Sequence, residues 1–368
     1  MLVEAYEKIN KERANLDLDK YFNTITLKRQ KGKGMFCGMD YVAIKKLRPI
    51  EYYSRFNHCK NTAYTASKLT DNLCIQLAGA LHDVGVCSFA HVNSFKKGEA
   101  LTQENDELNV KNIILQDEEL LTYLHEDQIN IDDVCDASKY NLIDKEIPAL
   151  CLDRADGILT TCLIWQHTHS IEEISELYDM LGYVDTLNGM CFDLSSKRLR
   201  EFDGEVVLNE WFPGPGYEDF FKAINVYSKV LLSKESRYMM EVFGLMLNYY
   251  EDIGLIDEKD LFYLSEEEII NKILDSKYKD VWCDVTSFDK VRYAKDNSKD
   301  DLIIMSKPKI RQANPLCCGQ MEVCEIDGIS GDFYRELNPI IDDIILTDKP
   351  LIGNLSNYTK KILTKYQK

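Results

Sequence analysis

Apolar residues recur along this chain mostly with the period of an α-helix, and the clearest example lies at residues 71–85. Leucine, alanine and valine repeat there at the spacing of one helical face. Asp71 is the expected N-cap and Gly85 the expected C-terminal stop. Because nearly every residue between them is apolar, we expect this helix to be buried on most of its circumference.

The rest of the pattern predicts a mainly α protein. Further helices are predicted at 57–69, 146–165, 170–181, 216–232, 236–253 and 265–274, with Pro148 in the first turn of the second of these. Strand-like or irregular pieces are predicted near 205–208, 302–305 and 320–326. The turn-rich segment 211–217 is the best internal boundary. We therefore expect a helical half packed against a mixed, mostly helical C-terminal half with a few short strands.

The charge of the chain narrows its classes of partner. Its 368 residues carry 62 Asp and Glu against 44 Lys and Arg, which gives a formal net charge of −18. Such a chain repels phosphate backbones, so general nucleic-acid binding is not expected. Its apolar runs fall far short of the roughly 20 residues that span a bilayer, and the charged start, 1–11, is unlike a signal peptide. The sequence thus predicts a soluble cytoplasmic protein with no membrane partner.

Twelve cysteines are scattered without the paired spacing of a disulfide framework. We expect most of them to be small buried side chains in a reducing compartment. The one cluster, Cys317, Cys318 and Cys324, lacks the C-x-x-C spacing of a structural zinc site. Ordinary strand or loop residues are therefore the favoured interpretation of this cluster.

Two histidines sit beside candidate metal ligands. His58 shares a helical face with apolar neighbours, so its ring is expected to point inward. His82 and Asp83 end the buried helix, and a buried Asp beside a buried His is costly unless a cation compensates it. Asp153 and Asp156 pose the same problem in another apolar helix, and either one facing inward would complete a set of four ligands. Two imidazoles with carboxylates suit Mn, Fe, Zn or Ni.

These residues carry a family resemblance. The order His58, His82-Asp83 and Asp153 is similar to the H…HD…D signature of HD-domain phosphohydrolases. Residues 55–58 (RFNH), 82–85 (HDVG) and 89–91 (FAH) resemble stretches of the deoxynucleoside-triphosphate triphosphohydrolase branch. A little-characterised bacterial set of HD proteins is resembled by residues 53–55 (YSR), 89–92 (FAHV), 101–104 (LTQE) and 260–267 (DLFYLSEE).

The resemblance implies a fold and a cofactor. An HD-domain helical bundle would occupy residues 51–175, after an N-terminal extension packed on the core, 1–50, and before a mostly helical C-terminal region, 176–368. The cofactor would be one divalent metal ion (Mn, Fe, Zn or Ni), which polarises a phosphoryl oxygen and lowers the pKa of a bound water. Its ligands would be His58, His82, Asp83 and Asp153.

The same resemblance implies further site residues. Arg55 and Arg154 would clamp phosphate oxygens, with Gln103 also at the substrate. His91 and Glu104 would be the catalytic groups. The alternative for both arginines is a structural salt bridge, and the alternative for His91 is a core histidine whose hydrogen bonds are satisfied.

Four positions depart from the triphosphohydrolase branch. Ser94, Gln103, Gly157 and Thr161 stand where that branch has an Asp, a His, a Tyr and an Asp. These changes remove a catalytic relay and a sugar clamp, so we expect hydrolysis of another phosphoester or phosphoanhydride, with a nucleotide favoured. The alternative is a catalytically degenerate HD-domain nucleotide sensor or oligomeric scaffold. A third is a phosphodiesterase, since Gly157 leaves room for a bulkier ligand. We also expect self-association into a homo-oligomer.

Overall fold

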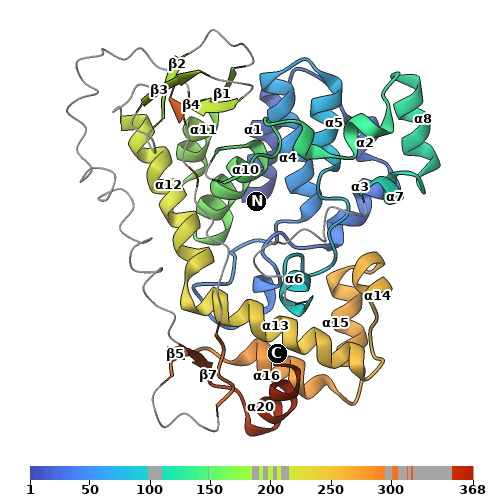
Figure 1. The fold of residues 1–368 in the computed structure, drawn as a ribbon, viewed down its shortest axis with the longest axis vertical. Helices are drawn as coiled ribbons and strands as arrows, with labels where there is room; N and C mark the ends of the chain where they lie inside the picture. Colours follow the sequence, from blue (N-terminus) through green and yellow to red (C-terminus); the bar gives the residue numbers. More distant parts are fainter. Residues whose placement is uncertain are drawn as a thin grey trace.

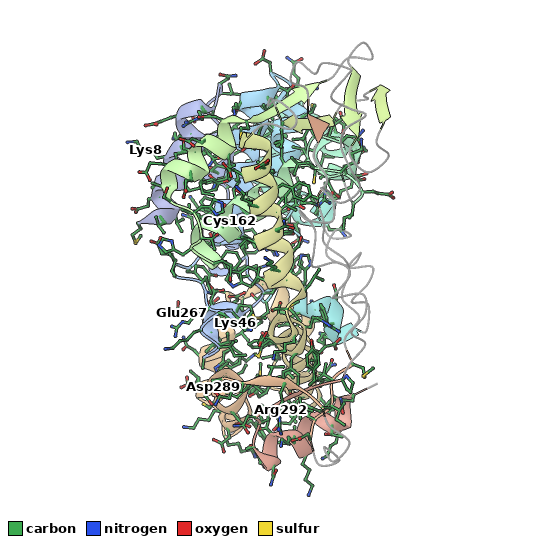
Figure 2. The ribbon with its side chains drawn as sticks, turned by 90° about the vertical axis from the view of Figure 1, so that its left-hand side faces the viewer. Lys8, Lys46, Cys162, Glu267, Asp289 and Arg292 are labelled. Atoms are coloured by element: carbon green, nitrogen blue, oxygen red, sulfur yellow. The ribbon has the colours of Figure 1, made fainter. Side chains whose placement is uncertain are left out.

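The computed structural model describes residues 1–97, 110–147, 149–184, 190–193, 198–201, 205–208, 215–294, 301–305, 313, 316–317 and 350–367. Helices dominate these residues, and the predicted mainly α class is confirmed (Figure 1). One apolar cluster of buried side chains runs through both the upper and the lower parts of Figure 1. In the side view of Figure 2, the buried Cys162 lies in the upper part, and Asp289 and Arg292 lie in the lower part.

Helix α4 (Arg55–Leu69) lies at the centre of the upper part, against α1 (Leu2–Arg13), α5 (Leu73–Leu81) and α10 (Leu152–Thr160). It begins at Ser54, whose hydroxyl accepts the backbone N–H of Asn57 while the Asn57 side chain accepts the backbone N–H of Ser54. The prediction of a helix at 57–69 is therefore confirmed, with the start two residues earlier.

Two predicted helices are shorter than expected, for local reasons. Helix α5 is capped by Asn72 rather than by Asp71, because the Asn72 side chain accepts the Cys74 N–H, and it ends at Leu81. Helix α10 begins at Leu152 rather than near residue 146, and five residues of π-helix, Thr161–Trp165, follow it. The predicted placement of Pro148 lies outside the described residues.

The loop before α10 explains its late start. Backbone carbonyls of Leu142 and Ile143 accept the N–H groups of Leu152 and Asp153, 2.9 and 3.2 Å away. These donors belong to the first turn of the helix, where no intrahelical acceptor exists. The loop therefore caps the first turn of the helix, which carries the metal-ligand candidate Asp153.

Other helices complete the fold. They are α2 (Asp19–Phe22), α3 (Ile25–Lys28), η1 (Arg29–Gly32), η2 (Met39–Tyr41), α6 (Val92–Lys97), α7 (Val110–Ile114), α8 (Glu118–Glu126), α9 (Ile131–Val134), η4 (Ala137–Lys139), α11 (Ile171–Asp179), α12 (Pro215–Leu232), α13 (Lys234–Asp252), α14 (Glu258–Tyr263), α15 (Glu266–Leu274), α16 (Lys279–Ser287), α20 (Asn357–Leu363) and η6 (Thr364–Tyr366). The helices predicted at 170–181, 216–232, 236–253 and 265–274 are confirmed as α11, α12, α13 and α15. Helix α12 runs between the upper and lower parts and leads into α13 (Figure 1).

The strands form two small sheets. The first has the order β1-β4-β6-β2-β3, made from β1 (Leu181–Val184), β2 (Met190–Asp193), β3 (Arg198–Glu201), β4 (Glu205–Leu208) and β6 (Leu316–Cys317). The second pairs β5 (Val291–Tyr293) with β7 (Leu351–Gly353) in antiparallel fashion. The strand predicted at 205–208 is confirmed as β4.

Several other predictions have a partial outcome. In the stretch 302–305 the structure has one isolated bridge, from Ile304 to Leu351. The stretch 320–326, Cys318 and Cys324, and most of the boundary segment 211–217 lie outside the described residues. The three predicted domain ranges stay predictions, although α1 does pack on α4 as expected of an N-terminal extension. Within the described ranges, no helix combines the length and apolarity that a membrane span needs.

Candidate metal centre

The four predicted metal ligands meet at one point between three elements. His58 comes from α4, His82 and Asp83 from the turn that follows α5, and Asp153 from the first turn of α10. The Nε2 atom of His58 lies 3.1 Å from Nε2 of His82, 3.0 Å from Oδ1 of Asp153 and 3.7 Å from Oδ2 of Asp83. Side chains up to 95 residues apart in sequence therefore converge on a single volume.

Hydrogen bonds on the far side of each ring leave the Nε2 lone pairs free for a ligand. His58 Nδ1 donates to Oδ2 of Asp156 at 2.6 Å, and His82 Nδ1 donates to the carbonyl of Gly79 at 2.8 Å. Because a neutral imidazole carries one proton, both Nε2 atoms then present lone pairs to each other and to carboxylate oxygens. Such a contact between lone pairs is repulsive unless a positive charge, either a proton on one ring or a bound metal ion, lies between them.

The electrostatics of the centre also favour positive charge. Burial opposes protonation of His58, but its bonds to Asp153 and Asp156 and the nearby charge of Asp83 raise its pKa to about 10. Burial alone would raise the pKa of the Asp83 carboxyl, but the guanidinium of Arg55 and both imidazoles hold it well below its usual value. Two imidazole nitrogens and two carboxylates therefore fit a divalent transition metal.

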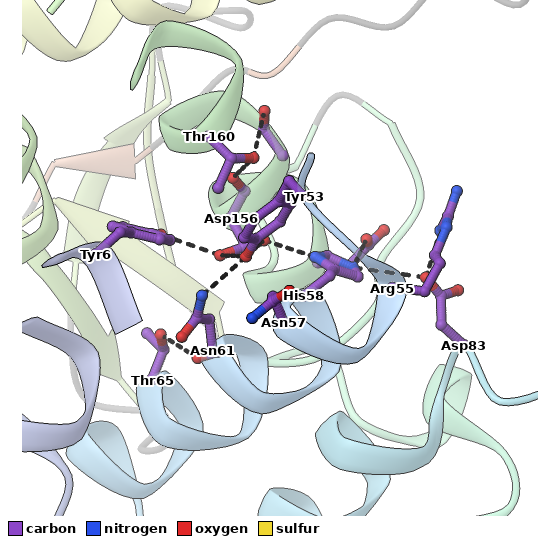
Figure 3. Close-up of polar contacts among 12 residues, drawn as sticks. Tyr6, Tyr53, Arg55, Asn57, His58, Asn61, Thr65, Asp83, Asp156 and Thr160 are labelled. Carbon is purple, nitrogen blue, oxygen red and sulfur yellow. Dashed lines mark hydrogen bonds and ion pairs between the residues drawn. The ribbon is translucent and has the colours of Figure 1, made fainter. Parts of the chain in front are cut away.

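A buried polar network orients His58 from behind (Figure 3). Asp156, one turn after Asp153 on α10, accepts from the hydroxyls of Tyr6 and Tyr53, both at 3.0 Å, as well as from His58. Tyr53 in turn accepts the Asn61 amide at 2.8 Å. The structure thus gives the two acids of α10 different roles, since one faces the centre and the other holds a ligand ring in place.

A second group of candidate ligands adjoins the first. Single ligand atoms of Asp144, Cys151 and Asp153 lie within 4.8 Å of one another. Asp153 links this group to the histidines, since its Oδ1 lies 3.0 Å from His58 Nε2 and 3.8 Å from His82 Nε2. Burial raises the pKa of the Cys151 thiol to about 12, and burial together with Asp153 raises the pKa of Asp144. A neutral thiol is a poor ligand, so the pair of imidazoles remains the better place for a cation.

His91 stands at the end of a loop with unusual backbone angles. Phe89 and Ala90, the two residues before it, have φ values of +63° and +48°. Residues other than glycine rarely adopt this region of backbone conformation. Helix α14 and its C-cap residue Leu264 hold this loop. Ser88 donates through its N–H to Leu261 O at 2.8 Å and through its hydroxyl to Leu264 O at 2.6 Å. The DLFYLSEE stretch therefore supports the loop that carries His91.

Glu266 is the side chain that joins these segments. It is fully buried and accepts the Phe89 N–H at 2.9 Å, the Gly34 N–H at 3.1 Å and the Tyr41 hydroxyl at 2.9 Å. It also lies beside Asp40, and burial together with Glu266 raises the pKa of Asp40 to about 7. The C-terminal half thus fixes two loops of the N-terminal half at the site.

The remaining predicted site residues differ in how close the structure places them to the metal centre. Arg55 is 2% exposed and forms an ion pair with Asp83, while its Nε has no acceptor within the described part of the chain. Arg154 donates to the carbonyls of Ala149 and, at 3.0 Å, Lys145, so it holds the loop before α10. Contacts of both arginines with substrate stay predictions. Gln103 and Glu104 lie outside the described residues.

A pocket opens beside Arg55 and His91. It is partly open to solvent and has a cavity volume of about 100 Å³. Its walls are mostly apolar and sulfur-containing and come from Met35, Phe36, Cys37, Met39, Arg55, His91, Phe95, Gly157, Thr161, Trp165, Tyr227, Leu231, Ser236 and Met240. Gly157 and Thr161, two of the positions that depart from the triphosphohydrolase pattern, both line this space.

Sequence reasoning missed the network behind His58 and the anchor of the His91 loop. Tyr6 carries no motif, and Tyr53 stood out only as part of the stretch 53–55, with no role inferred for it. Only the fold brings both hydroxyls to Asp156. For Glu266 there was a signal, because the stretch 260–267 stood out by resemblance, although its role was not inferred.

Comparison with known proteins agrees with this geometry. Residues 55–161 match the family model described as the HD domain, and this range contains all four ligand candidates. The chain is also 23% identical over 240 residues to the "Uncharacterized protein YdhJ" of Bacillus subtilis (strain 168). That alignment covers 64% of this chain and 65% of the relative, which is just under two thirds of the relative's length.

Proposed function

Because this chain belongs to the HD-domain superfamily, we propose that it is a metal-dependent phosphohydrolase. The reaction is cleavage of a phosphoester or phosphoanhydride bond in a nucleotide or a related small molecule. The observation that supports it best is that two imidazole Nε2 lone pairs and two carboxylates meet at one point. A divalent cation there would relieve the repulsion among them.

A divalent cation bound there polarises a phosphoryl oxygen and lowers the pKa of a bound water. The residues of the chain supply orientation and charge around it. Asp156 and the Gly79 carbonyl fix the two imidazoles in the tautomer that keeps Nε2 available. Arg55 keeps an N–H for a phosphate oxygen after pairing with Asp83. His91, at the pocket wall, donates a proton to the leaving oxygen.

The proposal is tested with the purified protein and added Mn²⁺. Pooled nucleoside mono-, di- and triphosphates, dinucleotides and simple phosphoesters serve as substrates, and products are read by mass spectrometry. We expect products from the wild type and from Asp289→Ala, a control at an exposed surface acid, and none from Asp83→Ala. The absence of product from the wild type, with bound metal confirmed, would contradict the proposal.

A catalytically degenerate nucleotide sensor or scaffold is the second candidate. It is favoured by Gly157 and Thr161 at the pocket wall and by Ser94, whose buried hydroxyl has no partner within the described ranges. A sensor predicts that a nucleotide raises the melting temperature by mass action while no product forms. An enzyme predicts both stabilisation and turnover.

A further inference from the structure

We propose that the pocket beside the metal centre binds the organic group of the substrate and that it selects an aromatic or other apolar ring rather than a sugar. This inference rests on the proposed function, because it places the phosphate of the same substrate at Arg55 and the metal centre. It narrows the proposed substrate class, because a pocket that disfavours a sugar favours a phosphoester of an aromatic or other apolar group over a nucleotide.

The polar end of the pocket points to an anion. Arg55 lines the pocket, is 2% exposed, and has an Nε without an acceptor among the residues that the structure describes. A buried guanidinium N–H left without a partner is costly, so a phosphate oxygen at this point restores a charge-assisted hydrogen bond. Asp83 holds the other side of the same guanidinium, within 3.7 Å of both histidine Nε2 atoms. The anion site and the metal centre are thus one side chain apart.

The walls away from Arg55 suit an apolar ring. Three thioethers and four aromatic side chains surround the space, from Met35, Met39, Met240, Phe36, Phe95, Trp165 and Tyr227. Thioether sulfurs and aromatic edges make favourable contacts with the faces and edges of rings. Aromatic and thioether walls therefore stabilise a ring through packing and apolar burial.

The same walls offer little to a sugar. Apart from Arg55 and His91, the described wall has hydrogen-bonding side chains at Thr161, Tyr227 and Ser236, and the weakly polar thiol of Cys37. The indole N–H of Trp165 already donates to the Leu47 carbonyl. The described wall has no carboxylate and no side-chain amide. A sugar brings several hydroxyls that must exchange water for protein partners, and each buried hydroxyl left unpaired weakens binding. Discrimination against polar groups therefore follows from the composition of the wall.

Gly157 sets the width of the pocket. A Cβ at this position would lie 3.5 Å from the Tyr227 ring, which is ordinary contact. Atoms beyond that Cβ would enter the space in front of the ring, so glycine keeps the Tyr227 face open to a flat group. We therefore assign Gly157 as a specificity-determining position.

Binding of non-hydrolysable phosphonates tests this inference without relying on turnover. Phenylphosphonate, methylphosphonate and a ribose phosphonate, in which a C–P bond replaces the ester of ribose 5-phosphate, are titrated calorimetrically into the Mn²⁺-loaded protein. Because burying an aromatic ring is strongly favourable, phenylphosphonate is expected to bind roughly tenfold to hundredfold more tightly than methylphosphonate. The ribose phosphonate is expected to bind no more tightly than methylphosphonate.

Two variants and one control locate the effect in the pocket. Met240→Gln keeps the length of the side chain but adds an amide to the wall, and Gly157→Leu fills the space before Tyr227. Both are expected to lower affinity for phenylphosphonate at least about fivefold and to leave methylphosphonate binding unchanged. Met180→Gln changes a half-buried Met at the end of α11 and is expected to alter neither. Melting temperatures confirm that each variant is folded.

The outcomes separate this inference from the proposed function. Binding of the ribose phosphonate as tightly as phenylphosphonate or more tightly, or a phenyl preference that survives both pocket variants, overturns the inference. Absence of binding by every phosphonate also overturns it. In each of these cases the hydrolysis assay still decides the proposed function, because the comparison of wild type with Asp83→Ala asks only whether turnover requires the metal centre.

Discussion

Replacing Asp156 by Asn is the substitution that best isolates the orientation of His58. The carboxylate accepts three donors at 2.6 to 3.0 Å: His58 Nδ1 and the hydroxyls of Tyr6 and Tyr53. The amide has the same shape but one acceptor oxygen and one N–H₂ group. In either orientation of the amide, its N–H₂ group faces a group that donated a hydrogen bond to the carboxylate.

Both orientations of the amide weaken the metal centre. With its N–H₂ toward His58, the ring takes the other tautomer, and the proton moves to the Nε2 that should face the metal. With its N–H₂ toward the tyrosines, their hydroxyls must accept, although Tyr53 already accepts from Asn61 at 2.8 Å. Loss of such an orienting partner typically lowers metal affinity 10- to 100-fold, which is about 1.4 to 2.7 kcal/mol.

This loss can be measured in two ways. Calorimetric titration with Mn²⁺ gives the affinity directly. Urea unfolding at a metal concentration of about 100 times the wild-type Kd should show that metal stabilises the wild type by about 2.7 kcal/mol and Asp156→Asn by only about 0.4 to 1.4 kcal/mol. Asp289→Asn is the control at an exposed surface acid. An Asp156→Asn affinity within twofold of wild type would refute the proposed role of Asp156.

Three further predictions concern stability. Glu266→Ala leaves the buried N–H of Phe89 without its acceptor, so urea unfolding should show a loss of at least about 2 kcal/mol; a loss below about 0.5 kcal/mol would contradict the anchoring role. The pKa of Asp40 is raised to about 7 in the folded state, so between about pH 4 and pH 7 the folded protein keeps this carboxyl protonated while the unfolded chain ionises it. The free energy of unfolding is therefore highest below about pH 4 and falls as the pH rises through 7. Asp40→Asn should therefore match wild type near pH 4 and exceed it by roughly 1 to 4 kcal/mol at pH 8, and equal stabilisation at both values would be the contrary result. Gly157→Ala should raise unfolding free energy by about 0.5 to 1 kcal/mol, because alanine favours the helix and its Cβ meets Tyr227 at ordinary contact distance, whereas a destabilised variant would show the contact to be too close.

The elements that could be predicted from the sequence are those with a local cause. Helix α4 follows from its periodic pattern and the cap at Ser54, and α12 and α13 follow from long apolar periodicity. His58 and the His82-Asp83 pair were identifiable because their burial was predictable and a buried charge needs compensation. Their convergence is a property of the fold that the structure supplies.

The features that escaped prediction depend on contacts between distant segments. The start of α10 is set by carbonyls of Leu142 and Ile143, which satisfy its first donors. The bond between Glu266 and the Phe89 N–H joins residues 177 positions apart. Propensity and periodicity describe neighbours along the chain, so neither of these contacts leaves a local pattern in the sequence.

Anomalous diffraction from crystals grown with Mn²⁺ tests the metal centre most directly. The account predicts one strong anomalous peak bounded by His58 Nε2, His82 Nε2 and the carboxylates of Asp83 and Asp153, and loss of that peak in Asp83→Ala. A wild-type structure at saturating Mn²⁺ without density at this point, or with the cation only between Asp144 and Cys151, would contradict it.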